Sequence, residues 1–340
     1  MTGSPGRRPT LEEVARLAGV GRGTASRVIN GSSQVSERSR LAVEEAIARL
    51  GYVPNPAARA LVTRRTQAIA LVIAESEERI FGEPFFAGVV RGISAAVNAA
   101  QMQLVLLLSQ ADQRTMPFES YLTGQHVDGV LLLSVHDQDR LPHRLRELGI
   151  PVVLGGRVHG SDAGGYVDID NVLGARVAVD HLVHRGRTRI AHIAGPLDMV
   201  AGRDRLSGYR QGLAAAGLDD GIDRVANGDF SQHSGETAMR ELLVRCPDLD
   251  AVFCANDLMA AGALGVLREA ARSVPDEVSV VGFDDAPLAL LTHPPLTSVH
   301  QSPERMGREM VALLFEMVAE AAKPAPVRIL PTHLVVRGSS

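Results

Sequence analysis

The stretch GVGRGTASRVIN, which begins at Gly19, combines three glycines in five residues with two arginines, Arg22 and Arg27. An arginine can hold a phosphate group of a nucleotide, or it can read the edges of base pairs in double-stranded DNA. A phosphate-binding loop follows a buried strand, opens a long helix and usually carries a lysine. This stretch follows a helical pattern, and the one lysine of the chain, Lys323, is far away in sequence. The context therefore favours DNA.

Three short helices are expected around this stretch. Residues 11–18 place apolar side chains on one helical face, with Thr10 as N-cap and Glu13 as its partner in a capping box. A second helix is expected over residues 22–30 and a third over 37–50. Two short helices joined by a glycine-containing turn and braced by a third form a helix-turn-helix. The expected core residues are Leu11, Val14, Ala15, Ala18, Ala25, Val28, Ile29, Leu41, Ile47 and Leu50.

The charge of the sequence is divided unevenly. Residues 1–66 contain eleven arginines and five glutamates, a net charge of +6, whereas the whole chain carries −4. The remaining residues therefore carry −10. A basic head on an acidic body indicates a module that binds a polyanion and a larger part that binds something else.

The bulk composition excludes several classes of protein. No apolar run approaches the roughly 20 residues that span a bilayer. The start, MTGSPGRRPT, lacks the apolar core of a secretory signal, so the protein is expected in the cytoplasm, at the nucleoid. Cys246, Cys254 and the eleven histidines lack the spacing of a metal site, so neither a metal nor a cofactor is expected.

The run TLEEVARLAGVGRGTASRVING, with VSERSRLAVEEAIARLGYVPNPAARALVTRRT, resembles the DNA-binding head and hinge of the lactose-repressor family of bacterial transcription regulators. The similarity continues to the C-terminus. The resemblance implies that the second helix lies in the major groove, where Arg22, Gly23 and Arg27 face base edges. Positions that mostly contact phosphates or position the head match Thr10, Thr24, Ser26, Asn30, Tyr52 and Asn55. For Thr24 and Ser26, ordinary capping or solvent exposure is an equal alternative.

Two positions depart from the family pattern. Gly21 stands where the family usually has serine, so a hydroxyl that could cap the second helix and contact a phosphate is missing. Gly23 has no side chain, which leaves base reading mainly to Arg22 and Arg27. Because arginine prefers guanine O6 and N7, at ~1–3 kcal/mol of discrimination per good pair, a G·C-rich half-site is expected. The alternative for each arginine is a phosphate contact without sequence information.

Residues 54–66 are expected to form a hinge. This short basic segment, with Asn55 as cap, is a marginal helix when alone. The resemblance implies that it folds on operator DNA beside its twin and inserts Leu61 into the minor groove. Arg59 and Arg64 are then further DNA contacts. The alternative is an ordinary linker in which Leu61 packs on the body.

From residue 67 onward, short apolar runs alternate with amphipathic stretches such as 85–100 and 171–185. Parallel strands with helical crossovers form doubly wound α/β lobes, whose ligands bind at the carboxyl ends of the strands. The runs that predict buried parallel strands are IALVIA, LVLLLS, VDGVLLLS, PVVLGG, IAHIAG, DAVFCAND and VSVVGFDD. The final PVRILPTHLVVRGSS is expected to supply the last strands.

The predicted fold is a small all-α helix-turn-helix head and an α/β body of two lobes with doubly wound parallel sheets, which the resemblance identifies as periplasmic-binding-protein-like. The expected domains are residues 1–53 for the head, 54–66 for the hinge and 67–340 for the effector-binding and dimerisation domain. Within the last, the expected N-lobe is about 67–168 plus 299–328, and the C-lobe is about 169–298 plus 329–340.

Polar side chains follow the ends of several predicted strands. Asn256 and Asp257 come after AVFCA, and Asp284 and Asp285 come after VVGF. Asp257 is expected to cap the helix that follows it. The residues that match the family's effector contacts are Phe85, Phe86, Arg205, Phe230, Asn256, Asp284 and Gln301. Arginine and carboxylate side chains beside an aromatic face suit a neutral carbohydrate. For Phe85 or Phe86, a position in the core is an equal alternative to one at the cleft.

An enzyme is the main alternative class. Asp284 and Asp285 are adjacent on a strand end, so they point to opposite faces and are poorly placed as the acid and base of a glycosidase. No nucleophile elbow or lysine base accompanies them. A transport-type binding protein needs a signal peptide and no basic head. We therefore expect a non-enzymatic, sugar-controlled repressor that binds an inverted repeat as a homodimer, without a leucine-heptad tail for tetramers.

Several stretches resemble actinobacterial cellulose-utilisation repressors over nearly the whole chain. This resemblance implies cellobiose or a cello-oligosaccharide as the inducer and cellulose-utilisation genes as the targets. Another disaccharide, or an effector that strengthens DNA binding, stays open. The stretches are GVGRGTASRVING, FGEPFFAGV, GQHVDGVLLLSVH, YVDIDN, AGPLDMVAG and VPDEVSVVGFDD.

Overall fold

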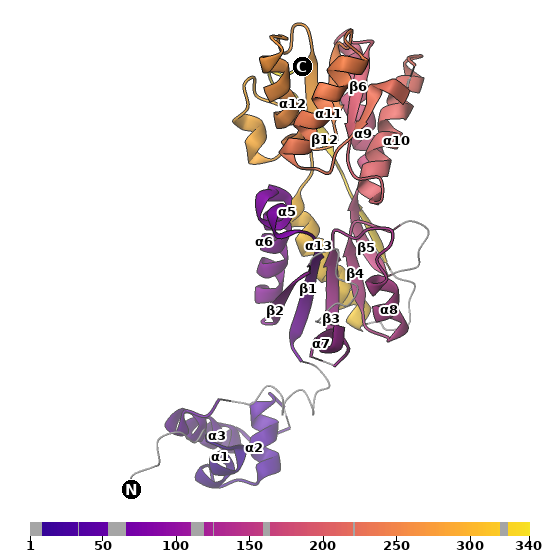
Figure 1. Ribbon diagram of the computed structural model, residues 1–340. Helices are drawn as coiled ribbons and strands as arrows, with labels where there is room; N and C mark the ends of the chain where they lie inside the picture. The colour runs from indigo at the N-terminus through magenta and orange to yellow at the C-terminus, as the bar shows by residue number, and fades with distance from the viewer. Residues whose placement is uncertain are drawn as a thin grey trace. The chain divides into compact units, whose positions relative to one another are not determined.

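The computed structural model of the chain divides into two compact units, Met1–Gln67 and Ala68–Ser340, here termed the head and the body (Figure 1). The described residues are 9–32, 34–53, 66–109, 119–124, 126–158, 164–219, 222–319 and 326–340. The expected hinge contacts Asn55, Arg59, Leu61 and Arg64 lie outside these residues.

The head is built from α1 (Leu11–Leu17), α2 (Arg22–Ile29) and α3 (Glu37–Leu50). The Thr10 hydroxyl accepts a hydrogen bond from the Glu13 backbone N–H, and the Glu13 carboxylate accepts one from the Thr10 N–H at 2.8 Å. The predicted capping box is therefore confirmed. Gly51 ends α3 with φ of 61°, a left-handed conformation that glycine adopts without strain.

The core of the head lies where the three helices meet. Val14, Ala15, Ala25, Val43 and Ala46 are buried. The partly buried residues around them are Leu11, Ala18, Val20, Val28, Ile29, Ile47, Leu50 and Tyr52. The prediction for Leu41 was wrong, because its side chain is 57% exposed. Leu41 precedes Val43 by two residues, which is about 200° around a helix and therefore on the opposite face.

The first lobe of the body contains a six-stranded, all-parallel sheet in the order β11-β5-β4-β3-β1-β2 among the described residues. Its strands are β1 (Ala68–Ala74), β2 (Gln103–Ser109), β3 (Gly129–Leu133), β4 (Val152–Gly155), β5 (Gly165–Ile169) and β11 (Val327–Leu330). Its helices are α5 (Glu77–Gly82), α6 (Pro84–Ala99), α7 (Glu119–Thr123), α8 (Leu141–Glu147) and α13 (Pro303–Ala319).

The central strand β1 is covered on both faces. Ile69, Leu71 and Ile73 belong to the core that includes α6 and α13, whereas Ala70 and Val72 belong to the core that includes α7 and α8. Alternate residues of a strand point to opposite faces, so a strand buried on both sides reads as an unbroken apolar run. This arrangement explains the run IALVIA.

Among the residues that the structure describes, the second lobe contains the other six-stranded sheet, in the order β12-β10-β9-β8-β6-β7. Every pair in it is parallel except β10 with β12, which is antiparallel. Its strands are β6 (Ile190–Ala194), β7 (Val225–Asn227), β8 (Ala251–Cys254), β9 (Ser279–Asp284), β10 (Thr297–His300) and β12 (His333–Val335). Its α-helices are α9 (Asn171–His184), α10 (Val200–Ala215), α11 (Gln232–Arg245) and α12 (Asp257–Glu269).

The chain passes between the lobes at three places: from β5 to α9, from β10 to α13, and from β11 to β12 (Figure 1). The approximate lobe boundaries expected at about 298/299 and 328/329 lie within a few residues of the ends of β10 and β11. Both strands pair to their ends, His300 with Asp284 and Leu330 with Ile169. The crossings therefore lie beyond His300 and Leu330.

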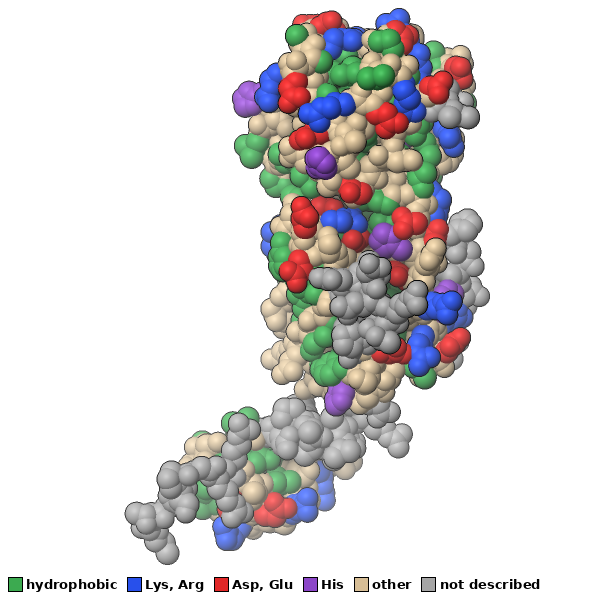
Figure 2. Space-filling model, in the orientation of Figure 1, with side chains coloured by type: hydrophobic (Ala, Val, Ile, Leu, Met, Phe, Trp, Pro, Cys, Tyr) green, Lys and Arg blue, Asp and Glu red, His purple; other side chains and the backbone are tan. Residues whose placement is uncertain are grey.

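Charged side chains are mixed over the visible face of the body, where Figure 2 shows acidic and basic groups interspersed. Within the described residues, no helix is both long and apolar enough to cross a membrane. The same residues contain no group of three or more His, Cys, Asp or Glu that could hold a metal ion.

Candidate functional site

A cleft of about 700 Å³, counting its open mouth, lies between the two lobes of the body. It is bordered by the carboxyl ends of strands from both sheets, as expected for doubly wound lobes. The structure brings together in it all seven residues predicted to contact an effector: Phe85, Phe86, Arg205, Phe230, Asn256, Asp284 and Gln301. Their role as ligand contacts stays a prediction.

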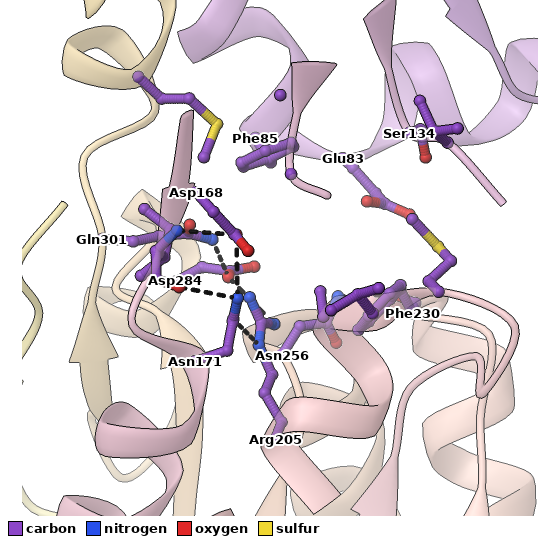
Figure 3. Close-up of a pocket in the computed structure, with 18 of the residues that line it drawn as sticks. Glu83, Phe85, Ser134, Asp168, Asn171, Arg205, Phe230, Asn256, Asp284 and Gln301 are labelled. Carbon is purple, nitrogen blue, oxygen red and sulfur yellow. Dashed lines mark hydrogen bonds and ion pairs between the residues drawn. The ribbon is translucent and has the colours of Figure 1, made fainter. Parts of the chain in front are cut away.

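Arg205 organises one end of the cleft, where it projects from α10 and is 5% exposed. Its Nε donates to Asn171 Oδ1 at 2.9 Å (Figure 3). Its Nη1 donates to the Ala255 carbonyl at 2.5 Å. Nη1 also lies 3.6 Å from Asp284 Oδ1. The guanidinium stacks 3.7 Å from the centroid of the Phe283 ring, a cation–π contact that fixes its plane.

Asp284 ends β9 with φ of 108°, and Asp285 follows with φ of 53°. Positive φ is rare for residues other than glycine, and such strain gathers at functional sites. Gln301 Nε2 donates to Asp284 Oδ1 at 2.5 Å. Burial raises the pKa of Asp284 to about 6, while the Arg205 charge acts in the opposite direction. The side chain is thus held at the cleft by groups from two other elements.

The cap of α12 differs from the prediction. Asn256, not Asp257, caps the helix, since its Oδ1 accepts from the Met259 N–H at 2.9 Å. Asn256 Nδ2 also donates to the Phe230 carbonyl at 2.8 Å, so its amide fixes the loop that carries Phe230. Asp257 is the first helical residue, and its side chain instead accepts from Ser298 Oγ at 2.6 Å. Its burial, with the nearby Asp284, raises its pKa well above the ordinary value.

The aromatic residues come from both lobes. Phe85 and Phe86 pack edge to face, with ring centroids 5.6 Å apart. Phe86 is 2% exposed and belongs to the core, whereas Phe85 is only partly buried. Phe230 has φ of 73°, and the guanidinium carbons of Arg79 and Arg205 lie 5.6 and 5.7 Å from its ring centroid. Each phenylalanine therefore has one face or edge at the cleft.

Sequence reasoning missed Asp168 and Asn171, which line the same end of the cleft as Arg205. Asn171 Nδ2 donates to Asp168 Oδ1 at 3.2 Å. Asp168 is 3% exposed, and burial raises its pKa to about 6. The signal that could have found them is the rule that sites lie at strand ends. It failed because β5, GYVDI, contains glycine and aspartate and does not read as an apolar run. Below, "inner group" denotes Asp168, Asn171, Arg205, Asp284 and Gln301.

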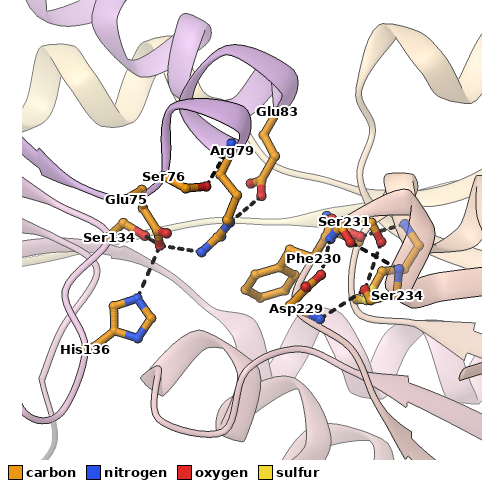
Figure 4. A network of polar contacts seen from close by, with 12 residues as sticks. Glu75, Ser76, Arg79, Glu83, Ser134, His136, Asp229, Phe230, Ser231 and Ser234 are labelled. Carbon is orange, nitrogen blue, oxygen red and sulfur yellow. Dashed lines mark hydrogen bonds and ion pairs between the residues drawn. The ribbon is translucent and has the colours of Figure 1, made fainter. Parts of the chain in front are cut away.

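A second polar cluster that the sequence did not indicate lies on the first lobe (Figure 4). Arg79 pairs with Glu75, and its Nε donates to Glu83 Oε1 at 2.7 Å. Ser134 Oγ donates to Glu75 Oε1 at 2.5 Å, and His136 Nε2 lies 3.2 Å from the same oxygen. Burial raises the pKa of Glu83 to about 7, although Arg79 opposes this. Of these residues, Arg79, Glu83 and Ser134 line the cleft.

Loops after β3 and β6 join the lobes directly. Arg203 of the second lobe donates to both carboxylate oxygens of Asp137, at 2.5 and 2.9 Å. The Asp137 N–H donates to the Asp198 carbonyl at 2.9 Å. His136 Nδ1 lies 2.7 Å from Asp198 Oδ2. These four residues are here termed the clasp. In the first sheet β4 lies between β3 and the crossing strand β5, and in the second sheet β8 and β9 lie between β6 and the crossing strand β10, so the clasp is a contact between the lobes apart from the crossings.

In the head, α2 exposes Arg22, Gly23 and Arg27. Gly21 is the N-cap and makes no side-chain cap, as the missing serine predicted. Arg22 Nε lies 3.1 Å from Glu12 Oε1 on α1. A Cβ built on Gly23 would lie 4.0 Å from Arg27 Nη2, so the Arg27 guanidinium extends back over this glycine. Glu12 is a residue that sequence reasoning did not single out.

The remaining predicted head residues have mainly local contacts. The Thr10 hydroxyl is used in the capping box, and Asn30 Nδ2 donates to Ser26 Oγ at 3.4 Å. Thr24 is half-buried, and Tyr52 packs on the core of the head. Nothing in these contacts tests whether they meet phosphates.

Known proteins match the head and the body separately. Residues 10–55 match the family described as bacterial regulatory proteins, lacI family, and residues 179–340 match a periplasmic binding protein-like domain. The chain is 54% identical over 336 residues to the HTH-type transcriptional regulator CelR of Thermobifida fusca, covering 98% of each. A solved structure described as a transcriptional regulator CelR–cellobiose complex aligns with a TM-score of 0.79 and 51% identity, over 98% of this chain and 100% of that one. The lac repressor dimer bound to operator and the anti-inducer ONPF aligns with a TM-score of 0.83 and 28% identity, over 98% of this chain and 99% of that one.

Proposed function

The chain belongs to the lacI family of bacterial regulatory proteins, and on that premise we propose that it is a repressor released from its operator by cellobiose or a related cello-oligosaccharide. Family membership confirms the predicted fold class and the prediction of a DNA-binding regulator that is not an enzyme. The sugar, the operator contacts and the assembly are proposals. The cleft between the lobes, which gathers charged, amide and aromatic side chains in one place, is the observation that supports sugar binding most directly.

The proposed DNA contacts lie on α2. Arg22, Gly23 and Arg27 are exposed side by side on one helix, and the missing side chain of Gly23 leaves room for the Arg27 guanidinium. Two arginines on a recognition helix favour guanines, each good pair contributing ~1–3 kcal/mol of discrimination. We therefore expect a G·C-rich half-site. The similarity to CelR supports the further proposal that the genes under its control serve cellulose utilisation.

The proposed sugar contacts are the inner group and the three phenylalanines. Gln301 donates a hydrogen bond to Asp284 Oδ1, and the Arg205 guanidinium pairs with the same oxygen. Within the part of the chain that the structure describes, Oδ2 of Asp284 has no protein partner, so it is available for a sugar hydroxyl. Carboxylates and amides fixed in this way suit adjacent hydroxyls, and aromatic rings suit the C–H face of a pyranose. The similarity to CelR over 98% of the chain supports cellobiose in particular.

The proposed assembly is a homodimer whose two heads bind an inverted repeat, because two-fold symmetric proteins read two-fold symmetric sites. The lac repressor dimer in the aligned structure supports this arrangement. A repressor acts on the chromosome, so we place it in the cytoplasm. Sugar binding changes the relation of the two lobes through the crossings, and the hinge transmits this change to the heads. A coupling of ~1–3 kcal/mol between the sites is enough to alter DNA affinity 5- to 150-fold.

The test starts with the full-length protein and a random pool of duplex DNA. After selection, fluorescence anisotropy measures affinity for the selected duplex with and without cellobiose, maltose, ribose and glucose at fixed salt, since DNA affinities depend steeply on salt. We expect a palindrome to be selected and cellobiose to weaken its binding at least fivefold. A sugar that strengthens binding would establish co-repression instead. Selection of no palindrome over random duplex would contradict the proposal altogether.

A further inference from the structure

The cleft has polar groups at two separate places. Figure 3 shows the inner group around Asp284 on one side, and Glu83 with Ser134 on the other, with Phe230 below Glu83. Arg79 lines the cleft beside Glu83. Below, "outer group" denotes Arg79, Glu83 and Ser134. The two groups come from different strands and helices, so the cleft offers two sets of hydrogen-bonding groups within one space.

The outer group has unused hydrogen-bonding capacity. Glu83 Oε1 accepts from Arg79 Nε, and Arg79 Nη1 is taken by Glu75. Among the described residues, neither Glu83 Oε2 nor Arg79 Nη2 has a protein partner. Both side chains are largely buried, with 10% and 16% of their surface exposed. A charged pair that is buried at a cleft wall and keeps one donor and one acceptor unused is expensive to maintain for stability alone.

The charge of the outer group selects the chemistry of its partner. The carboxylates of Glu75 and Glu83 offset the charges of the Arg79 guanidinium and of His136, whose imidazole contacts Glu75. No excess positive charge is left for a phosphate or carboxylate ligand. A donor beside an acceptor instead fits two adjacent hydroxyls of a neutral sugar. The Phe230 ring centroid lies 5.6 Å from the Arg79 guanidinium carbon (Figure 4). Phe230 can therefore contact the apolar C–H side of the sugar ring whose hydroxyls Arg79 and Glu83 bind.

We propose that Arg79 and Glu83 bind the second hexose unit of a disaccharide whose first unit lies at the inner group. This inference rests on the proposed function. It makes the outer group the part of the cleft that distinguishes disaccharides from monosaccharides. A monosaccharide at the inner group leaves the Glu83 carboxylate and the Arg79 guanidinium without their ligand partners, and unpaired buried polar groups discriminate strongly between ligands.

The test uses the full-length protein, with cellobiose as the probe and maltose where cellobiose does not bind. Isothermal titration compares the wild type with Glu83→Ala and Glu83→Gln. Glu83→Gln keeps an oxygen for Arg79 Nε, so it separates loss of sugar contact from collapse of the cluster. Glu78→Ala, which changes an exposed glutamate on α5, the helix that Glu83 C-caps, is the matched control. Thermal unfolding confirms that each variant is folded.

We expect disaccharide affinity to fall at least tenfold in Glu83→Ala, to fall less in Glu83→Gln, and to stay within twofold in Glu78→Ala. Saturation-transfer NMR of the bound disaccharide should lose signal from the protons of one ring only. Equal affinity of Glu83→Ala and wild type, or equal loss from both rings, overturns the inference while leaving the sugar-controlled repressor intact. A wild type that binds no disaccharide overturns both.

Discussion

His136 of the first lobe lies with its Nδ1 2.7 Å from Asp198 Oδ2 of the second lobe, and its Nε2 lies 3.2 Å from Glu75 Oε1. One imidazole therefore connects Glu75, the partner of the cleft residues Arg79 and Ser134, to Asp198 in the loop of the other lobe. The His136 N–H of the backbone also donates to Asp139 at 2.8 Å, which holds the loop that presents the ring. Such a bridge between two carboxylates is strongest when the imidazole is protonated.

This geometry predicts a pH dependence of stability. The hydrogen bond to Glu75, with the charge of Asp198, raises the pKa of His136 to about 9, above its ordinary value of 6.5. A raised pKa means that the native state holds the proton more tightly than the unfolded state. The contribution to the free energy of unfolding is therefore complete below pH 6.5 and lost as the pH rises through about 9. Because Asp198 is 58% exposed, we expect a contribution on the order of 1 kcal/mol.

Thermal unfolding of wild type and His136→Gln at pH 6 and pH 9.5 checks this prediction. The difference in melting temperature should be larger at pH 6. His233→Gln is the control, because its side chain is 88% exposed. A His136→Gln difference that is equal at the two pH values would show that the ring contributes by packing alone.

Asp284→Ala should separate sugar response from DNA binding. The carboxylate lies at the cleft beside Gln301 and Arg205, and its removal leaves the Arg205 guanidinium without its nearest charge. Losing a hydrogen bond to a charged group contributes about 1.5–3 kcal/mol. We therefore expect sugar affinity to fall roughly 10- to 100-fold. Operator affinity without sugar should stay within twofold, as measured by anisotropy. The exposed Asp219→Ala is the control. Normal release by sugar in Asp284→Ala would contradict the assignment.

Substitution by alanine should change the free energy of unfolding in opposite directions at two glycines. A Cβ on Gly92 of α6 would lie 2.1 Å from the Glu304 carbonyl oxygen of α13, so the two helices would have to separate. Overpacking of this kind typically costs about 1–3 kcal/mol. Gly265 of α12 has no atom within 4 Å of an added Cβ, and alanine favours a helix over glycine by up to about 1 kcal/mol. Chemical denaturation should show Gly92→Ala destabilised and Gly265→Ala unchanged or stabilised. Equal effects would mean that α6 and α13 are not in close contact.

The fold could be predicted where one physical rule acts alone. All seven apolar runs are strands, because parallel strands covered on both faces require unbroken apolar sequence. The strands β5, β7 and β10 were not indicated by apolar runs, because each contains polar or small residues, although only β7 of the three is an edge strand. Leu41 was misplaced because its helical face is set by where Val43 and Ala46 meet the other helices.

The site could be predicted only as far as the family pattern reaches. Strand ends and resemblance together led to the seven residues that line the cleft. Arg79, Glu83 and Ser134 were missed. Arg79 pairs with Glu75 and Glu83, each four residues away, which in sequence looks like ordinary helical ion pairing, and its burial at the cleft and the contact of Ser134 with Glu75 arise only in the folded lobe. Asp257 was misassigned since Asn and Asp are equally good caps in sequence, and only the backbone angles decide which one is the N-cap.

In the head, Glu12 of α1 and Arg22 of α2 form an ion pair of 3.1 Å. Arg22 is the first residue of α2, where the positive end of the helix disfavours a cation, and α2 has no acidic residue in its first turn. Glu12 supplies the missing negative charge from the neighbouring helix. The contact engages Nε and leaves the two terminal nitrogens of Arg22 for guanine O6 and N7.

We therefore expect Glu12→Gln to raise the affinity for DNA in general and to lower the discrimination between base pairs. Removal of a negative charge from the basic head should strengthen binding to all duplexes by a similar factor. Loss of the ion pair should at the same time reduce discrimination between G·C and A·T at the position that Arg22 reads, by at most the ~1–3 kcal/mol of one arginine–guanine pair. Arg22→Ala should remove the same discrimination and weaken binding.

Glu44→Gln, at an exposed site on α3, supplies the control for charge alone. Anisotropy on the selected operator and on single-base variants measures both quantities. If Glu12→Gln and Glu44→Gln raise affinity alike with base preference unchanged, Glu12 acts only through its charge and does not orient Arg22.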